Sequence, residues 1–124
     1  NQRGAASGDA VYSAIMHVRS FEIQEVADTD LRKLHDYLLE VGGFEFRAGG
    51  SGFFVLVGER FIATSGATNG QIVMASREAD TINVDVVAAG GGNGDTASQL
   101  ATSQRATELL RGFAERGALT ITDI

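Results

Sequence analysis

The chain of 124 residues contains no cysteine and no proline. Without cysteine it cannot hold a disulfide scaffold, a thiol nucleophile, or a zinc or iron–sulfur site ligated by thiolates. Without proline its turns must rely on glycine, of which there are 16, and on Asn and Asp. A cysteine-free chain suits the cytoplasm and an exported mature protein equally, so the composition leaves the compartment open.

Positive charge is also scarce. Lys33 is the only lysine, and the formal net charge is −6. Proteins that bind nucleic acid or anionic membranes cluster their cations. Here most arginines are scattered singly along the chain, and the three between residues 105 and 116 are interrupted by Glu108 and Glu115. We therefore expect no nucleic-acid partner.

Long hydrophobic runs are missing as well. The longest, Phe53–Val57, has five residues, whereas a helix that spans a bilayer needs about 20, so we expect a soluble protein without a transmembrane segment. The chain begins at Asn1 with no visible signal peptide, which suggests a trimmed or mature form. We interpret residues 1–10 as a flexible lead-in and residues 11–124 as a single α+β domain.

Between residues 43 and 94, short apolar runs alternate with turn signals that contain glycine. This pattern is typical of an antiparallel meander and predicts strands near residues 44–48, 52–57, 60–66, 71–76 and 81–88. Asn69-Gly70 predicts a type I′ hairpin turn, and Gly58-Glu59 fits a type II′ turn with glycine first. The alternation over residues 81–86 indicates a sheet with one buried and one polar face.

Two segments have the periodicity of helices. The first covers residues 29–41, with Asp28 or Asp30 as its cap and Gly42-Gly43 as its end. Its apolar face consists of Leu31, Leu34, Leu38 and Val41. The second covers residues from about 96 to 116 and ends at Gly117. Its apolar positions lie in the second half, so we expect the polar first half to be exposed or frayed.

Segment 11–24 fits two structures. As a strand, it alternates over residues 12–18 and then needs a bulge near Ser20, because the apolar face switches to Phe21 and Ile23. As a helix, it would carry an apolar stripe over residues 11–18. Its β-branched and aromatic content favours the strand. With a final strand near residues 118–122, the prediction is a two-layer α+β fold, β-α-β-β-β-β-β-α-β, in which two helices pack on one face of an antiparallel meander sheet.

The glycine-rich segment Gly90–Asp95, between a strand and a helix, is the one tempting ligand motif. A dinucleotide-binding loop would need glycine at position 95, which is Asp, and a Walker loop would need a lysine that the segment lacks. Asp95 also comes one residue early for the calcium-binding nonapeptide repeat. We interpret the segment as a connector in which Asp95 or Thr96 caps the helix, and we expect no cofactor.

Two histidines are present, His17 and His35. Neither has a second histidine or a carboxylate four residues away on the same face, so the zincin pattern is missing and we expect no metal. The sequence leaves open a site that pairs the two histidines across the fold, and both therefore remain candidates for a ligand site.

The adjacent residues Phe53 and Phe54 are candidates for an interface. If residues 52–57 form a strand, the two side chains must point to opposite faces of the sheet. Either both faces are covered and both rings belong to the core, or, as we expect for two helices of modest length, only one face is covered. The other face would then expose an aromatic side chain to a partner or a ligand.

Two hypotheses of function follow. The first is a non-catalytic binding or assembly module that acts through an exposed sheet face or edge, with a protein partner or by self-association. It rests on the lack of a catalytic motif, such as a nucleophile elbow. The alternative is a small-molecule-binding or cofactor-free enzymatic cavity between the sheet and the C-terminal helix, which would use a histidine or a carboxylate. No catalytic residue is assigned.

Overall fold

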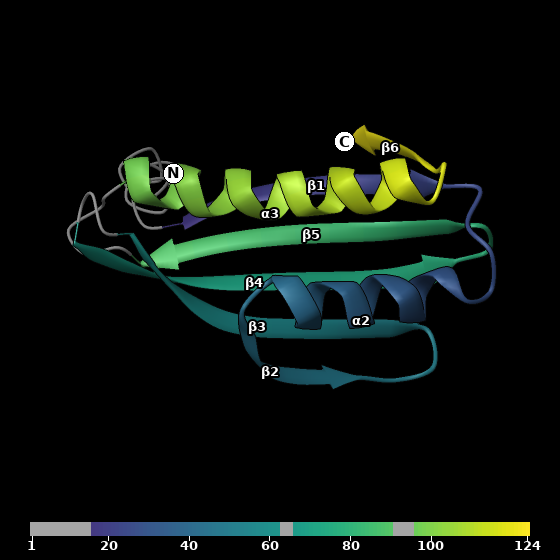
Figure 1. Ribbon diagram of the computed structural model, residues 1–124, viewed down its shortest axis with the longest axis horizontal. Coiled ribbons are helices and arrows are strands. Elements are labelled where there is room, and N and C mark those ends of the chain that lie inside the picture. Colours follow the sequence, from purple (N-terminus) through teal and green to yellow (C-terminus); the bar gives the residue numbers. More distant parts are fainter. Residues whose placement is uncertain (1–15, 63–65, 91–95) are drawn as a thin grey trace, which may run out of the picture.

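The computed structural model describes residues 16–62, 66–90 and 96–124, which form one antiparallel sheet and two helices (Figure 1). The strands are β1 (Met16–Gln24), β2 (Phe44–Gly49), β3 (Phe53–Ile62), β4 (Ala67–Glu78), β5 (Thr81–Gly90) and β6 (Thr120–Asp123), and the helices are α2 (Asp30–Val41) and α3 (Thr96–Arg116). The strand order is β2-β3-β4-β5-β1-β6. Both helices lie on the same side of the sheet, with α2 over β3 and β4 and α3 mainly over β5 and β1. The predicted two-layer α+β class is confirmed.

The described part of segment 11–24 is a strand, as the sequence favoured. It pairs with β5 in unbroken register from Met16 opposite Ala89 to Ile23 opposite Ile82. The predicted bulge near Ser20 is therefore wrong. The strand has apolar side chains on both faces, so the apolar pattern can change sides without a change of register. Residues 1–10, the predicted lead-in, and residues 11–15 lie outside the described residues.

Both predicted hairpin turns in the meander are wrong. Strand β3 runs through Gly58-Glu59 without a break, so the predicted strands 52–57 and 60–66 are one strand, and the sheet has one strand fewer than expected. Asn69-Gly70 lies inside β4, paired with β3 on one side and β5 on the other. The hairpin joins Ile62 to Ala67 instead, where Gly66 has a φ of 68°.

The buried environment of Asn69 explains why it is not in a turn. Its side chain is fully buried beneath α3. Its Nδ2 donates to the Thr102 Oγ1 at 3.2 Å, and its Oδ1 accepts from the Ser98 Oγ at 3.4 Å. These partners come from another element, so the local hairpin signal could not reveal them.

Gly58 has a packing role rather than a turn role. Strand β2 contains an irregularity between Phe44 and Phe46, opposite this part of β3. A Cβ atom at position 58 would lie 2.8 Å from the Gly43 carbonyl oxygen and 3.0 Å from the Phe44 Cα. Glycine is therefore required here because two backbones approach closely.

Helix α2 matches its prediction in extent but not in its cap. Thr29 is the N-cap residue and makes no side-chain capping bond, while the Asp30 carboxylate accepts a hydrogen bond from the Ala27 N–H at 2.7 Å. The helix ends at Val41 with Gly42 as its C-cap, and Gly43 has a φ of 73°, as expected for the glycine pair that was predicted to end it.

Helix α3 has the predicted bounds, but its first half is not exposed. Small polar residues of that half are buried against the sheet, namely Ser98, Gln99, Thr102 and Ser103. At its C-terminus the left-handed residue is Ala118, with a φ of 55°, and not Gly117. The Leu119 N–H donates to the Ala114 carbonyl at 2.8 Å, and the Ala118 N–H donates to the Glu115 carbonyl at 3.2 Å, which is the Schellman pattern.

The hydrophobic core lies between the sheet and the two helices. Its fully buried large side chains are Phe21, Ile23, Leu34, Leu38, Leu56, Val73, Ile82, Val84, Val86 and Leu110. In β5 the even-numbered side chains from residue 82 to 88 are all buried, so the predicted alternation along this strand is confirmed.

Candidate functional site

The two faces of the sheet differ in what covers them. Phe54 is only 4 % exposed and belongs to the core beneath the helices, whereas Phe53 is 50 % exposed on the opposite face. The expectation that these two side chains point opposite ways is confirmed. No described helix covers the face that carries Phe53, which we call the open face.

A continuous row of apolar side chains crosses the open face. The strand registers place Phe46, Val57, Ile72, Val87 and Val18 opposite one another, one from each of the five strands β2, β3, β4, β5 and β1. We call this set the apolar row. Its ends are the most exposed, with Phe46 at 59 % and Val18 at 54 %. Directly paired side chains lie within contact distance in an antiparallel sheet, so the row forms one apolar surface.

The rest of the open face adds both apolar and acidic groups. Phe53, Phe61, Met74 and Met16 are exposed around the row. The charged residues that the strand registers place on this face are all acidic: Glu22, Glu59, Glu78 and Asp85. The arginines of the strands lie at the alternate positions, which face the helix-covered side. On the described strands, the open face is therefore an apolar surface whose charged residues are all acidic.

A second feature lies at the end of the sheet that carries the β2–β3 turn, between this turn and the start of α2. Phe53 of the open face borders it there, because its ring lies next to Gly50 of the turn. An open cleft of about 540 Å³ has Arg32, Arg47, Arg77, His35, Phe53 and Phe54 among its lining residues. We call it the arginine cleft. The β2–β3 turn forms part of its wall through Gly49, Gly50 and Ser51.

His35 is held in this cleft by two neighbours. Its Nδ1 lies 2.9 Å from the Asp36 Oδ1, and its ring meets the Phe54 ring edge-on with centroids 5.3 Å apart. The hydrogen bond with His35 and the charges of Arg32 and His35 outweigh desolvation and lower the pKa of Asp36. Asp36 is therefore ionised at neutral pH.

His17 lies elsewhere. It is on the helix-covered side of β1, opposite Ala88, and its Nδ1 is buried without a hydrogen-bond partner among the described residues. His35 packs against Phe54 of β3, and strands β4 and β5 lie between β3 and β1. At a spacing of about 4.8 Å per strand, β1 and β3 are about 14 Å apart. The fold does not bring the two histidines together, and within the described ranges no group of three His, Asp or Glu residues could hold a metal.

The space under α3, where the alternative hypothesis expects a cavity, holds a polar layer instead. The helix contributes Ser98, Gln99, Thr102, Ser103 and Thr107, and β4 contributes Asn69 and Gln71, all of them buried. Sequence analysis missed this layer. The sequence does contain a signal that this half of the helix is buried, because positions 99, 103, 106 and 110 lie on one helical face and carry no charge.

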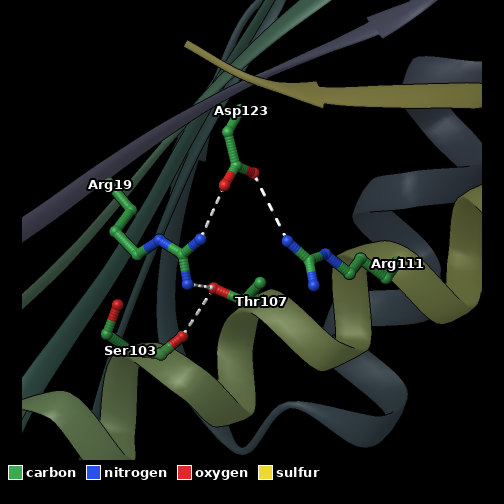
Figure 2. Close-up of polar contacts among 5 residues, drawn as sticks. All are labelled: Arg19, Ser103, Thr107, Arg111 and Asp123. Atoms are coloured by element: carbon green, nitrogen blue, oxygen red, sulfur yellow. Dashed lines mark hydrogen bonds and ion pairs between the residues drawn. The ribbon is translucent and has the colours of Figure 1, made fainter.

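Figure 2 shows how the outer edge of this layer is held. The Arg19 guanidinium on β1 donates to the Thr107 Oγ1 at 3.3 Å and forms an ion pair with Asp123 on β6 at 2.9 Å. The Thr107 hydroxyl donates to the Ser103 carbonyl at 2.9 Å, and Arg111 approaches the other Asp123 oxygen at 3.5 Å. The contacts of Arg19 and Arg111 with Thr107 and Asp123 link β1, β6 and α3.

A further cation, Arg60, lies on the helix-covered side of β3. Burial, together with the nearby charge of Arg105, lowers the pKa of Arg60. Arginine remains protonated in proteins at neutral pH even so. The Arg105 side chain itself donates to the carbonyl oxygens of Gly42 and Val41, at 3.2 and 3.1 Å, and thereby connects α3 to the end of α2.

Comparison with known proteins adds no family assignment: no protein-family model matches the chain, and no curated protein matches it. Neither described helix has an apolar stretch long enough to cross a bilayer. Residues 91–95 of the Gly90–Asp95 motif lie outside the described residues.

Proposed function

We propose that the protein is a non-catalytic binding module whose open face docks a protein partner. The partner has apolar side chains flanked by Lys or Arg. The observation that carries this proposal is the apolar row, which crosses five strands and has Phe46 and Val18 more than half exposed at its ends. Contiguous exposed apolar patches on small proteins mark interaction sites.

The open face has the size that such a partner needs. Five strands at about 4.8 Å spacing, each with about eight residues of about 3.3 Å, give a projected area of about 600 Å². The accessible area of a face covered with side chains exceeds its projection. A standard protein interface buries about 800 Å² on each partner, so the open face is large enough for one.

The charge on the open face selects among partners. A second copy of the chain would place Glu22, Glu59 and Asp85 against an equally acidic surface, and like charges that face each other cost several kcal/mol. A partner with basic residues around an apolar centre would instead pair its cations with these carboxylates. Charge complementarity therefore favours a basic amphipathic partner over self-association.

The alternative function receives less support. A ligand cavity between the sheet and the C-terminal helix would need space that buried polar side chains, such as Asn69 and Gln99, occupy. These side chains hydrogen-bond to the fold: Asn69 to Thr102, and Gln99 to the Gly90 carbonyl at 2.8 Å.

The test uses two fluorescent peptides that alternate Leu with Lys or Leu with Glu, so that they share apolar pattern and differ in charge. Binding is measured by anisotropy near physiological salt. We expect the Leu/Lys peptide to bind and the Leu/Glu peptide not to bind. The double variant Phe46→Ser, Val18→Ser keeps the net charge and removes both ends of the apolar row, so it should weaken binding about tenfold or more.

Leu100→Ser is the matched control, because Leu100 is 52 % exposed on α3, away from the open face. It should bind like the parent, and all variants should melt within a few degrees of it. Equal binding by the double variant would show that mere charge attraction holds the peptide and would refute the proposal. A stable dimer in light scattering that dissociates in the double variant would replace the basic partner with a second copy.

A further inference from the structure

The arginine cleft gathers positive charge that the sequence scatters. Arg32 comes from α2, Arg47 from β2 and Arg77 from β4, and these are three of only nine arginines in a chain of net charge −6. The Arg77 N–H donates to the Gly52 carbonyl at 2.8 Å, which ties the end of β4 to the β2–β3 turn. This contact places Arg77 and Arg47 at the same end of the sheet, beneath the first turns of α2.

The cations of the cleft are only weakly neutralised. Asp28 is the carboxylate among the lining residues, and it pairs with Arg77 at 2.9 Å while its own side chain is 94 % exposed. Arg32 pairs with Asp36 at 3.5 Å, and both of these side chains are largely exposed. Ion pairs in solvent contribute little, so an incoming anion can compete with them. Arg47 makes no ion pair within the part of the chain that the structure describes.

One arginine of the cleft, Arg77, is held in position by the fold before any ligand binds. The Arg77 Nε donates to the Ala79 carbonyl at 2.7 Å, and its side chain is only 26 % exposed. A guanidinium held in this way loses little freedom when it binds a ligand. Its planar array of donors matches the oxygens of a carboxylate or a phosphate.

The wall of the cleft is aromatic, and at the turn Gly49 and Gly50 contribute only backbone to it. A Cβ atom at Gly50 would lie 2.8 Å from the Phe53 Cε1, so the Phe53 ring lies across the turn. Phe54 and the Leu31 side chain add apolar surface, and His35 stands edge-on to Phe54. Small-molecule sites combine such apolar walls with a few convergent polar groups, in clefts of about 300–1,000 Å³.

We propose that the arginine cleft binds a small organic oxyanion, a carboxylate or phosphate monoester that carries a flat apolar group. The oxyanion lies between Arg47 and Arg77, and the apolar group contacts Phe53. This site is separate from the apolar row and from the space beneath α3.

The test measures amide chemical-shift changes during titration of the full chain with phenyl phosphate, benzoate, inorganic phosphate and benzylamine. We expect saturable changes at residues 28–35 and 47–54 with phenyl phosphate or benzoate. Inorganic phosphate should bind more weakly, and benzylamine, a cation of similar size, should not bind. The tighter of the two aryl anions identifies the preferred oxyanion.

Arg47→Gln should raise the dissociation constant about tenfold or more, the effect of one lost charge-assisted hydrogen bond. Arg111→Gln, which removes a half-exposed arginine from α3 and leaves the same net charge as Arg47→Gln, should not change it. If Arg47→Gln unfolds, Arg32→Gln serves the same purpose. The proposal is wrong if neither aryl anion binds at millimolar concentration, or if Arg111→Gln weakens binding as much as Arg47→Gln.

Failure here is distinguishable from failure of the proposed function. Arg47→Gln should leave binding of the Leu/Lys peptide to the open face unchanged, and the Phe46→Ser, Val18→Ser variant should leave binding of phenyl phosphate unchanged.

Discussion

Two glycines in neighbouring strands give a sharp test of the fold, because the same substitution should have opposite effects at each. Gly58 in β3 lies opposite Gln71 in β4, and Gly70 lies one residue away, opposite Glu59. At Gly58 an added Cβ would lie 2.8 Å from the backbone oxygen of Gly43, a contact that only a backbone shift can relieve. At Gly70 the nearest atom would be the Ala89 carbonyl oxygen at 3.8 Å, an ordinary van der Waals contact.

The magnitudes follow from these clearances. Overpacking of this kind costs about 1–3 kcal/mol, so Gly58→Ala should lower the free energy of unfolding by that amount. Glycine within a strand is less stable than alanine by about 0.5–1 kcal/mol, and Gly70 has no positive φ to favour it, so Gly70→Ala should stabilise the protein by that amount. At about 2.1 cal/mol/K per residue, each kcal/mol corresponds to about 4 °C in Tm for a chain of this size.

The assay is urea denaturation followed by circular dichroism, together with a thermal melt. The denaturation midpoint should fall for Gly58→Ala and rise for Gly70→Ala, with the slope m unchanged in both. Gly70→Val extends the test, because a type I′ turn would not tolerate valine whereas a strand favours it. Loss of stability in Gly70→Ala together with full stability in Gly58→Ala would refute the assignment of both glycines.

Three further predictions test separate parts of the structure. Ala118→Gly should stabilise the protein by about 0.5–1 kcal/mol in the same urea assay, because Ala118 has a φ of 55°; an unchanged midpoint would contradict the left-handed cap. Leu110→Ala should cost about 2–5 kcal/mol, because Leu110 is fully buried, whereas Leu100→Ala should change stability by less than about 0.5 kcal/mol; equal effects would contradict the orientation of α3. The lowered pKa of Asp36, due chiefly to its hydrogen bond with His35, stabilises the fold above about pH 4 and is lost as the pH falls through the folded-state pKa. Asp36→Asn should therefore flatten the acid limb of stability against pH, and an identical acid limb in both proteins would contradict this assignment.

Local patterns in the sequence were sufficient for much of the architecture. The positions of both helices, the alternation in β5 and the opposite directions of Phe53 and Phe54 depend only on the periods of 3.6 and 2. These periods are properties of neighbouring residues, so they can be read without knowledge of the fold. The two-layer α+β class follows from them.

The turns depended on more than local pattern. Asn69-Gly70 has the composition of a hairpin turn, yet Asn69 obtains its hydrogen bonds from Ser98 and Thr102, about 30 residues later in the chain. Gly58 is required by the approach of Gly43, the residue before β2, and not by a turn of its own. Propensity gave way in both cases to a contact between elements that only the folded chain creates.

The candidate sites show the same division. That one phenylalanine would be exposed could be derived from the sequence, but the apolar row could not, because it requires the strand order β2-β3-β4-β5-β1 and each register within it. The arginine cleft likewise joins Arg32, Arg47 and Arg77 from three separate elements. The sequence alone determined which side chains share a face of one element. The tertiary structure decided which faces meet, because strand pairing and helix packing bring together residues whose separation along the chain carries no periodic signal.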